Sequence, residues 1–260
     1  MPQTFAIEKT TFLSDGFRLT GVLHLPALHN PPLIVGSHGL MSSGESPKQI
    51  ALARRCNELG MAFFRFNHRG CLDSQGDFRK DTTFESRRRD LECAVEAARA
   101  EAGFPDRLGL FGSSLGGAVC LHAAASLSVQ ALVVTAAPIR NRAIADDAAG
   151  RGTLEVDPEF YRNHIRFDLS EALAAVSRVL IFHGDQDEIV PVSSGLEIYA
   201  EVGEPKKLVV LPEGDHLMSR GDHQERFIRE AGLWFERFLI PGHEAEIESK
   251  RPGGSGFQQP

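Results

Sequence analysis

The sequence predicts an α/β fold in which an eight-stranded, mostly parallel sheet is flanked by helices. Short apolar runs alternate along the chain with helical stretches, a pattern typical of parallel strands joined by crossover helices. Loops rich in Gly, Ser, Asp and His follow several of these runs. The length of 260 residues and the 42% hydrophobic content suit one such domain with a substantial core.

The expected elements follow in chain order. Strands at 5–13 and 17–25 open the chain, and Ser14-Asp15-Gly16 between them predicts the tight turn of an antiparallel hairpin. The remaining strands are expected at 33–37, 61–67, 107–111, 131–136, 178–182 and 207–211. Helices are expected at 48–59, 83–100, 118–125 and 224–239. The functional loops should leave the carboxyl ends of the strands, where open α/β sheets bind ligands.

Two segments depart from this alternation. Residues 137–176, within a single domain of residues 1–240, break the alternation after the sixth predicted strand, where an irregular segment could cover the site. A surface excursion without substrate contact is the alternative, although long irregular segments are more often functional. Arg140 and Arg142 could bind a carboxylated substrate, although arginines are common on surfaces. Residues 241–260 turn polar and glycine-rich, which predicts a flexible tail.

A glycine-flanked serine follows the predicted strand at 107–111. In Gly112-Ser113-Ser114-Leu115-Gly116, a glycine lies two residues to either side of Ser114. Glycine lacks a Cβ, so the chain can turn sharply and leave the Ser114 Oγ accessible ahead of a helix. The start of that helix directs free N–H groups and a positive dipole end at the same place. We interpret Ser114 as a catalytic nucleophile, with an ordinary strand-to-helix turn as the alternative.

Two later strands are each followed by a candidate partner for this serine. Asp187 follows the strand at 178–182, and His216 follows the strand at 207–211. A serine hydroxyl needs a general base, and the histidine that serves needs a carboxylate to fix its tautomer and stabilise its charged form. Ser114, Asp187 and His216 supply these groups, in a chain order that differs from those of chymotrypsin-like and subtilisin-like enzymes.

The loop after the predicted strand at 33–37 completes the expected chemistry. It reads His38-Gly39-Leu40, and an enzyme with this strand, serine and helix arrangement places its first oxyanion-hole loop there. We expect the backbone N–H groups of Leu40 and Leu115 to bind the negative oxygen of a tetrahedral intermediate. His38 could act as a base, but its position between a strand and a glycine favours a role in shaping the loop.

Taken together, these motifs resemble the α/β-hydrolase superfamily, close to the serine esterase and serine aminopeptidase-like branch that includes bacterial cinnamoyl or feruloyl esterases. The resemblance covers about residues 5–239. It implies that residues 137–176, after the sixth strand, form a small lid, so we expect a fairly open site. Its landmarks are His38-Gly39-Leu40, the stretch 64–70 with Ser74-Gln75-Gly76, the glycine-flanked Ser114, the stretch 183–187, and Gly214-Asp215-His216. Asn67 and Cys71 depart from the branch pattern, which concerns the loop after the fourth strand and leaves the triad untouched.

The acid of the triad has two candidates, because Asp185 and Asp187 lie in the same loop. The resemblance to the H-G-x-x-D segment of the superfamily favours Asp187. Asp215 adjoins His216 in sequence, so its carboxylate is expected to shape the turn. A metal site built from His183, Asp185, Asp187 and His216 is another interpretation, which no recognised ligand spacing supports.

Charge and cysteine content narrow the class of protein. A net charge of −7 and a pI near 5.8 provide no basic footprint for nucleic acid. No run approaches the roughly 20 apolar residues of a membrane span, and residues 1–11 do not resemble a signal peptide. Four cysteines without a C-x-x-C pair predict reduced thiols and a cytoplasmic location. Cys71 is the alternative nucleophile, and the run Arg87-Arg88-Arg89 indicates a solvated, ion-paired helix face.

These observations predict a serine hydrolase with the triad Ser114, Asp187 and His216 and the oxyanion hole of Leu40 and Leu115. A carboxylesterase for small or aromatic acyl esters is the first expectation, and a peptidase or thioesterase is the second. A catalytically silent ligand-binding module is the alternative from another class. We expect a small-molecule acyl substrate, no cofactor, no metal, and no nucleic-acid or membrane partner. The sequence leaves the oligomeric state open, a homodimer included.

Overall fold

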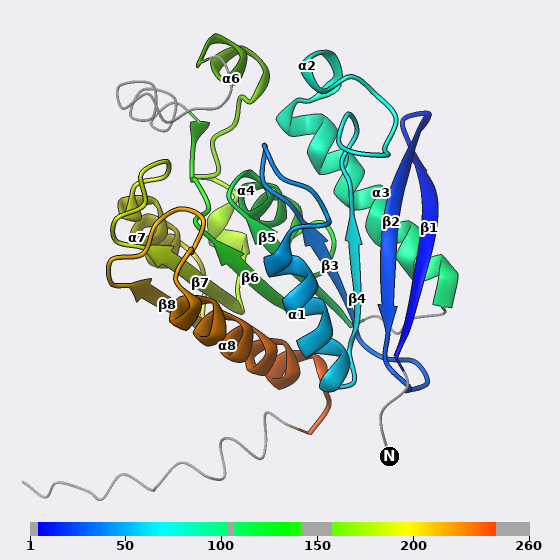
Figure 1. Ribbon diagram of the computed structural model, residues 1–260. Helices are drawn as coiled ribbons and strands as arrows, with labels where there is room; N and C mark the ends of the chain where they lie inside the picture. Colours follow the sequence, from blue (N-terminus) through cyan, green and yellow to red (C-terminus); the bar gives the residue numbers. More distant parts are fainter. Residues whose placement is uncertain (1–4, 103–106, 142–157, 243–260) are drawn as a thin grey trace, which may run out of the picture.

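The computed structural model describes residues 5–102, 107–141 and 158–242, and its centre is an eight-stranded sheet (Figure 1). The strand order is β1-β2-β4-β3-β5-β6-β7-β8. β2 pairs antiparallel with β1 and β4, and all other pairs are parallel, which confirms the predicted fold class. The strands are β1 (Ala6–Ser14), β2 (Phe17–Leu25), β3 (Leu33–Ser37), β4 (Ala62–Phe66), β5 (Leu108–Ser113), β6 (Ala131–Thr135), β7 (Val179–Gly184) and β8 (Lys206–Leu211).

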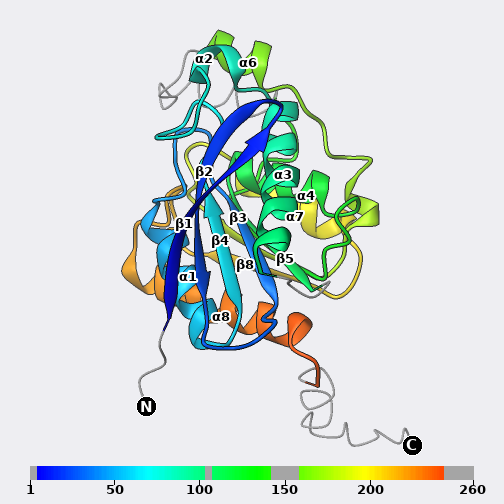
Figure 2. The same cartoon turned by 90° about the vertical axis from the view of Figure 1, so that its right-hand side faces the viewer.

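Helices cover both faces of the sheet. α1 and α8 pack on one face, and α3, α4 and α7 pack on the other (Figure 2). Two short helices, α2 and α6, lie at the carboxyl end of the parallel strands (Figure 1). The helices are α1 (Pro47–Glu58), α2 (Phe78–Asp81), α3 (Phe84–Ala102), α4 (Leu115–Ala123), α6 (Pro158–His164), α7 (Val192–Glu201) and α8 (Gly221–Leu239), with a 3₁₀ turn η1 (Leu173–Ala175).

Coverage on both faces explains the unbroken apolar runs of the central strands. In β3, Leu33 and Val35 join the core on the α3 and α4 side, whereas Ile34 joins the core on the α1 and α8 side. Successive side chains of a strand point to opposite faces, so a strand between two helical layers needs apolar residues throughout. The unbroken apolar runs that predicted these strands therefore also indicate a hydrophobic core on each face of the sheet.

Helix α7 is a ten-residue helix that the sequence patterns did not predict. Gly195 lies in its middle, and glycine lowers helix propensity. A Cβ at this position would lie 2.7 Å from the Nδ1 atom of His183, so only glycine lets the helix pack this closely on the end of β7. Tertiary packing, which outweighs local propensity here, accounts for the missed helix.

The chain between β6 and β7 leaves the sheet where the lid was predicted. Its described parts include α6 and η1, whereas residues 142–157, with Arg142, lie outside the described residues. Phe160 of α6 stacks on Phe78 of α2 with ring centroids 5.7 Å apart, so the two short helices lie side by side (Figure 2). Most of the predicted tail, residues 243–260, also lies outside the described residues.

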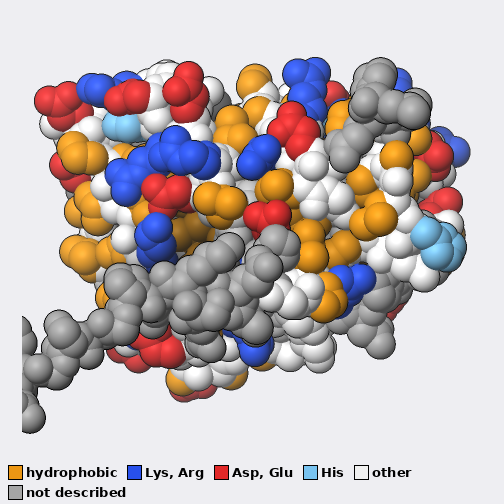
Figure 3. All heavy atoms as spheres, turned by 90° about the horizontal axis from the view of Figure 1, so that it is seen from below, with side chains coloured by type: hydrophobic (Ala, Val, Ile, Leu, Met, Phe, Trp, Pro, Cys, Tyr) orange, Lys and Arg blue, Asp and Glu red, His pale blue; other side chains and the backbone are white. Residues whose placement is uncertain are grey.

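At the end of the molecule away from α2 and α6, charged and apolar side chains are mixed on the surface. Figure 3 shows side chains of both charges lying among apolar ones on this face. Such a mixture is ordinary for the surface of a globular protein. Across the three described stretches, no helix combines the length and the apolar character that crossing a membrane requires.

Candidate active site

Ser114 lies in a sharp turn between β5 and α4. Its φ of 53° and ψ of −124° form a strained conformation for a non-glycine residue, of order 1–3 kcal/mol, which persists only where the surroundings impose it. The N–H of Ser114 donates to the carbonyl oxygen of Thr135 at 2.8 Å. α4 begins at the next residue, three residues earlier than predicted. The turn thus holds the Oγ atom at the start of a helix.

His216 and Asp187 reach Ser114 from the ends of two other strands. Asp187 follows β7 and His216 follows β8. The Nε2 atom of His216 lies 3.1 Å from Ser114 Oγ, and its Nδ1 atom lies 2.9 and 3.0 Å from the two carboxylate oxygens of Asp187. A carboxylate only accepts, so Nδ1 carries the proton and Nε2 can accept one from the serine hydroxyl. The structure therefore brings the three predicted residues into one hydrogen-bonded chain.

The surroundings of Asp187 keep its carboxylate charged and oriented. The backbone N–H groups of Ile189 and Val190 donate to Oδ1 at 2.9 and 2.7 Å. Burial alone would raise the pKa of Asp187, but hydrogen bonds from His183, His216 and Val190 outweigh it and hold the pKa well below its usual range. A carboxylate fixed in this way can orient an imidazole and stabilise its positive charge.

The two backbone N–H groups predicted as an oxyanion hole lie close to Ser114. Leu115 is the first residue of α4, and Leu40 follows Gly39 in the loop after β3. A Cβ on Gly39 would lie 3.4 Å from the Ser114 Cβ, so this loop packs directly against the serine. Within the described residues, neither N–H donates to a protein acceptor. Two unpaired donors beside a serine hydroxyl suit a developing negative oxygen.

His38 shapes this loop. Its side chain is buried, and its Nδ1 donates to the carbonyl oxygen of Gly39 at 2.7 Å. Its Nε2 accepts from the backbone N–H of His68 at 3.2 Å. Burial, with help from the nearby His68 and Arg87, holds the pKa of His38 well below its usual value. With both ring nitrogens engaged, the imidazole stays neutral and cannot serve as the base for Ser114.

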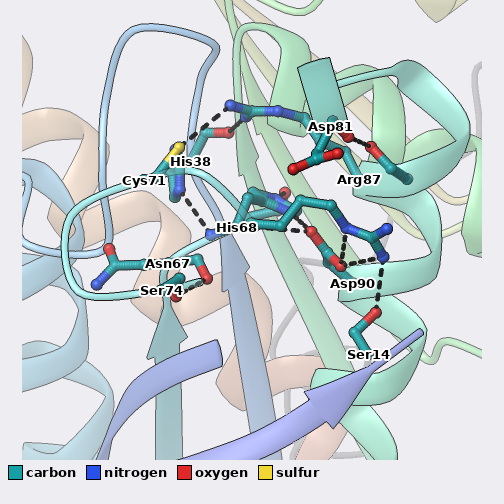
Figure 4. Close-up of polar contacts among 12 residues, drawn as sticks. Ser14, His38, Asn67, His68, Cys71, Ser74, Asp81, Arg87 and Asp90 are labelled. Carbon is teal, nitrogen blue, oxygen red and sulfur yellow. Dashed lines mark hydrogen bonds and ion pairs between the residues drawn. The ribbon is translucent and has the colours of Figure 1, made fainter. Parts of the chain in front are cut away.

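The expectation for the run Arg87-Arg88-Arg89 is wrong for its first residue. Arg88 and Arg89 are partly exposed and form ion pairs, as expected for a solvated helix face. Arg87, by contrast, has no exposed surface, and its guanidinium donates to three consecutive carbonyls of the loop after β3 (Figure 4). The sequence contained a signal for the burial of Arg87. This residue lies at helical spacing from the apolar residues Phe84 and Leu91, which both belong to the core.

A buried polar network fixes the loop after β4 beside this arginine (Figure 4). The Nε of Arg69 donates to Asp90 at 2.9 Å and its Nη2 at 2.7 Å, and the His68 ring joins the same carboxylate at 3.4 Å. Asn67, one of the two departures from the branch pattern, accepts from the Gly44 N–H at 2.8 Å. Cys71, the other, is buried, and burial raises the pKa of its thiol, which disfavours the reactive thiolate.

The remaining acidic candidates have other partners. Asp185 accepts from the backbone N–H of Glu213 at 2.6 Å, and Asp215 accepts from the N–H of Ser219 at 2.7 Å. Lys48 was missed by the sequence analysis. It faces the carboxylates of Asp215 and Asp187, and burial lowers its pKa to about 8. In the part of the chain that the structure describes, no group of three or more His, Cys, Asp or Glu is arranged to hold a metal ion.

Arg140, a candidate for binding a carboxylated substrate, is engaged by the protein itself. Its Nη1 and Nη2 atoms donate to the carboxylate of Glu197 in α7 at 3.0 and 2.6 Å. Nη2 also donates to the hydroxyl of Ser170 at 3.0 Å. The side chain thus ties the described start of the predicted lid to α7.

A mostly parallel sheet of this strand order, with a strained serine after β5 and its acid and histidine after β7 and β8, defines an α/β hydrolase. Within that class, residues 51–240 match the model of the prolyl oligopeptidase family, and the chain belongs to this family.

Two relatives and one solved structure are similar to this chain over most of its length. The uncharacterized protein YfhR of Salmonella typhimurium is 27% identical over 255 residues, covering 90% of this chain and 82% of YfhR. The mitochondrial palmitoyl-protein thioesterase ABHD10 of Mus musculus is 27% identical over 216 residues, covering 72% of this chain and 69% of ABHD10. The solved esterase domain of a Rhodothermus marinus protein has a TM-score of 0.69 at 24% identity, covering 90% of this chain and 99% of that domain. This structural likeness supports the hydrolase fold.

Proposed function

We propose that this hydrolase is a carboxylesterase that cleaves small or aromatic acyl esters through an acyl-enzyme on Ser114. The observation that carries the proposal is the hydrogen-bonded chain from Ser114 through His216 to Asp187, with a Ser114 Oγ to His216 Nε2 distance of 3.1 Å. A strained serine hydrogen-bonded to an imidazole nitrogen that can accept its proton is the arrangement that activates a hydroxyl for attack on a carbonyl carbon.

In acylation, His216 acts first as a general base and then as a general acid. As Ser114 Oγ attacks the ester carbonyl carbon, His216 Nε2 accepts the hydroxyl proton, and Asp187 stabilises the imidazolium. The carbonyl oxygen becomes an oxyanion that the N–H groups of Leu40 and Leu115 bind. His216 then donates its proton to the alkoxide leaving group, the tetrahedral intermediate collapses, and the alcohol departs.

Deacylation repeats the cycle with water. His216 Nε2 removes a proton from a water molecule, which attacks the acyl-enzyme carbonyl carbon and forms a second tetrahedral intermediate. The proton then passes from His216 to Ser114 Oγ as the C–O bond to the serine breaks. The carboxylic acid leaves and Ser114 is regenerated.

Ester cleavage has two kinds of support. The motifs resemble those of bacterial cinnamoyl or feruloyl esterases, and the Rhodothermus marinus domain of similar fold is an esterase. Thioester hydrolysis is the second candidate, favoured by the similarity to the palmitoyl-protein thioesterase ABHD10. The same residues would carry it out, because both reactions pass through an acyl-serine. The family name makes peptide cleavage a third outcome of the test.

The first experiment measures hydrolysis of p-nitrophenyl esters from acetyl to decanoyl and of methyl ferulate. Wild type is compared with Ser114→Ala, and Ser113→Ala is the matched control that removes the neighbouring hydroxyl. A palmitoyl thioester and a proline-containing peptide are assayed in parallel. Labelling by a fluorophosphonate, located by mass spectrometry, identifies the reactive serine.

We expect ester turnover in wild type and Ser113→Ala, its loss in Ser114→Ala, and a fluorophosphonate adduct on Ser114. If the thioester or the peptide is cleaved faster than any ester, the proposed substrate class is wrong, and the acyl-serine mechanism still holds. Turnover that is indifferent to Ser114→Ala would reject the acyl-serine mechanism, and binding without turnover would favour a silent ligand-binding module.

A further inference from the structure

One buried side chain outside the triad holds the loop that carries the Leu40 N–H. Arg87 of α3 is fully buried, and its Nη1 donates to the carbonyl oxygens of His38 and Gly39 at 3.2 and 3.1 Å. Its Nη2 donates to the carbonyl oxygen of Leu40 at 3.1 Å. Building on the proposed function, we infer that Arg87 is the positioning residue of the oxyanion hole, holding the Leu40 N–H towards the oxygen of the tetrahedral intermediate.

Peptide geometry links the Arg87 contacts to the opposite side of the loop. The carbonyl of Gly39 and the N–H of Leu40 belong to one planar trans peptide unit, so they point in opposite directions. Arg87 and the His38 ring both donate to the Gly39 carbonyl, at 3.1 and 2.7 Å. The Leu40 N–H is therefore turned away from α3. The other side of this loop packs against Ser114, because a Cβ on Gly39 would lie 3.4 Å from the Ser114 Cβ.

The short hydrogen bonds of Arg87 all go to carbonyls of the loop after β3. Within the described residues its guanidinium has no carboxylate in direct contact, and its remaining polar contact is Cys71 Sγ at 3.7 Å (Figure 4). Asp90, the nearby acid, accepts three hydrogen bonds from Arg69. A buried cation without an ion pair is costly to maintain in a site of low polarity. Here it polarises the loop peptides so that their N–H groups become stronger donors.

Only a guanidinium can make this set of contacts. Its planar fork presents several N–H donors in a fixed arrangement, whereas the lysine ammonium is a compact point charge. A lysine at position 87 could keep the charge but could not hold the carbonyls of His38, Gly39 and Leu40 at once. The lysine substitution therefore separates the geometric contribution of Arg87 from its electrostatic contribution.

The test compares Arg87→Met and Arg87→Lys with wild type. Arg88→Met is the matched control, since Arg88 is the next residue of α3 and forms ion pairs with Glu85 and Glu92 at the surface. Kinetic constants are measured with the best p-nitrophenyl ester and expressed per Ser114 labelled to completion by a fluorophosphonate, so that unfolded protein is not counted. The Ki of a trifluoromethyl ketone of matched acyl group reports binding of the tetrahedral adduct.

We expect Arg87→Met to lose about 10²–10³ in kcat per labelled serine, the effect of removing one oxyanion donor. KM should stay within about threefold, and the Ki of the ketone should weaken by the same factor as kcat/KM falls. Arg87→Lys should recover part of the loss, and Arg88→Met should match wild type. A purely structural role would lower the yield of folded protein without producing this parallel loss.

The contrary outcomes separate the inference from the proposed function. If Arg87→Met shows the wild-type kcat per labelled serine, the role of Arg87 is overturned and the acyl-serine mechanism still holds. If the methionine variant does not fold, the same result in Arg87→Lys has the same meaning. A loss confined to KM would overturn it as well. Absence of Ser114-dependent turnover in the wild type would instead overturn the proposed function.

Discussion

A methyl group at position 116 should push the loop after β3 away from Ser114. Gly116 lies in the first turn of α4, and its Cα faces the backbone where β3 ends. A Cβ on Gly116 would lie 2.7 Å from the carbonyl oxygen of His38 and closer still to that of Ser37. Both neighbours are backbone atoms, so no side-chain rotation can relieve the overlap.

The size of the effect follows from these distances. Ordinary contact for a Cβ begins at 3.4 Å, so the loop must retreat by about 1 Å, a strain of the kind that typically costs about 1–3 kcal/mol. The same loop carries the Leu40 N–H, and a misplacement of about 1 Å in a reacting site can cost about 10²-fold in rate. We therefore expect Gly116→Ala to lower kcat about 10²-fold and to lower the free energy of unfolding by about 1–3 kcal/mol.

Ester hydrolysis and urea unfolding measure the two effects. Gly221→Ala is the matched control, because a Cβ there meets nothing within 4 Å and alanine is the better helix former. Its kcat should be unchanged and its stability equal to or slightly above that of wild type. A Gly116→Ala enzyme with kcat within about threefold of wild type would refute the reasoning, since it would mean that the loop can yield without displacing Leu40.

Two further predictions concern acids and bases. Asp187→Asn should lower kcat by about 10³–10⁴, because the amide favours the wrong tautomer of His216. Asp185→Asn should stay active. If steady-state kinetics show the larger loss for Asp185→Asn, Asp185 is the acid of the triad. Burial lowers the pKa of His24 to about 4, below its usual 6.5, and its Nε2 accepts from Arg65 at 2.8 Å. The unfolded state therefore binds the proton more readily, and between pH 7 and pH 5 this group should cost about 2 kcal/mol of stability. His24→Gln should remove that part of the pH dependence in urea unfolding. Equal slopes for wild type and His24→Gln would contradict the assignment.

The fold was predictable to the extent that its elements are locally encoded. Asp15 and Gly16 adopt positive φ values of 47° and 83° in the predicted turn, because that turn type requires them and the residues tolerate them. Strands buried on both faces stood out as apolar runs. α7 was missed because its glycine allows close packing on His183 at the end of β7. α4 and α8 each begin three residues earlier than predicted, because periodicity fixes helix ends less firmly than helix centres.

Local sequence patterns were enough to predict the order of the elements, the strand end that each candidate residue follows, and the three residues that the structure joins in one hydrogen-bonded chain. These features depend on periodicity, turn residues and the rule that parallel strands direct their carboxyl ends to one edge. Which charged side chains are exposed, by contrast, depends on the packing of distant elements. Arg88 and Arg87 are neighbours in one arginine run, yet the first forms surface ion pairs and the second is sealed against the loop after β3. The burial of a helical side chain depends on what packs over that face. Here the loop after β3 and Cys71 of the loop after β4 contact Arg87, and no local pattern encodes these contacts.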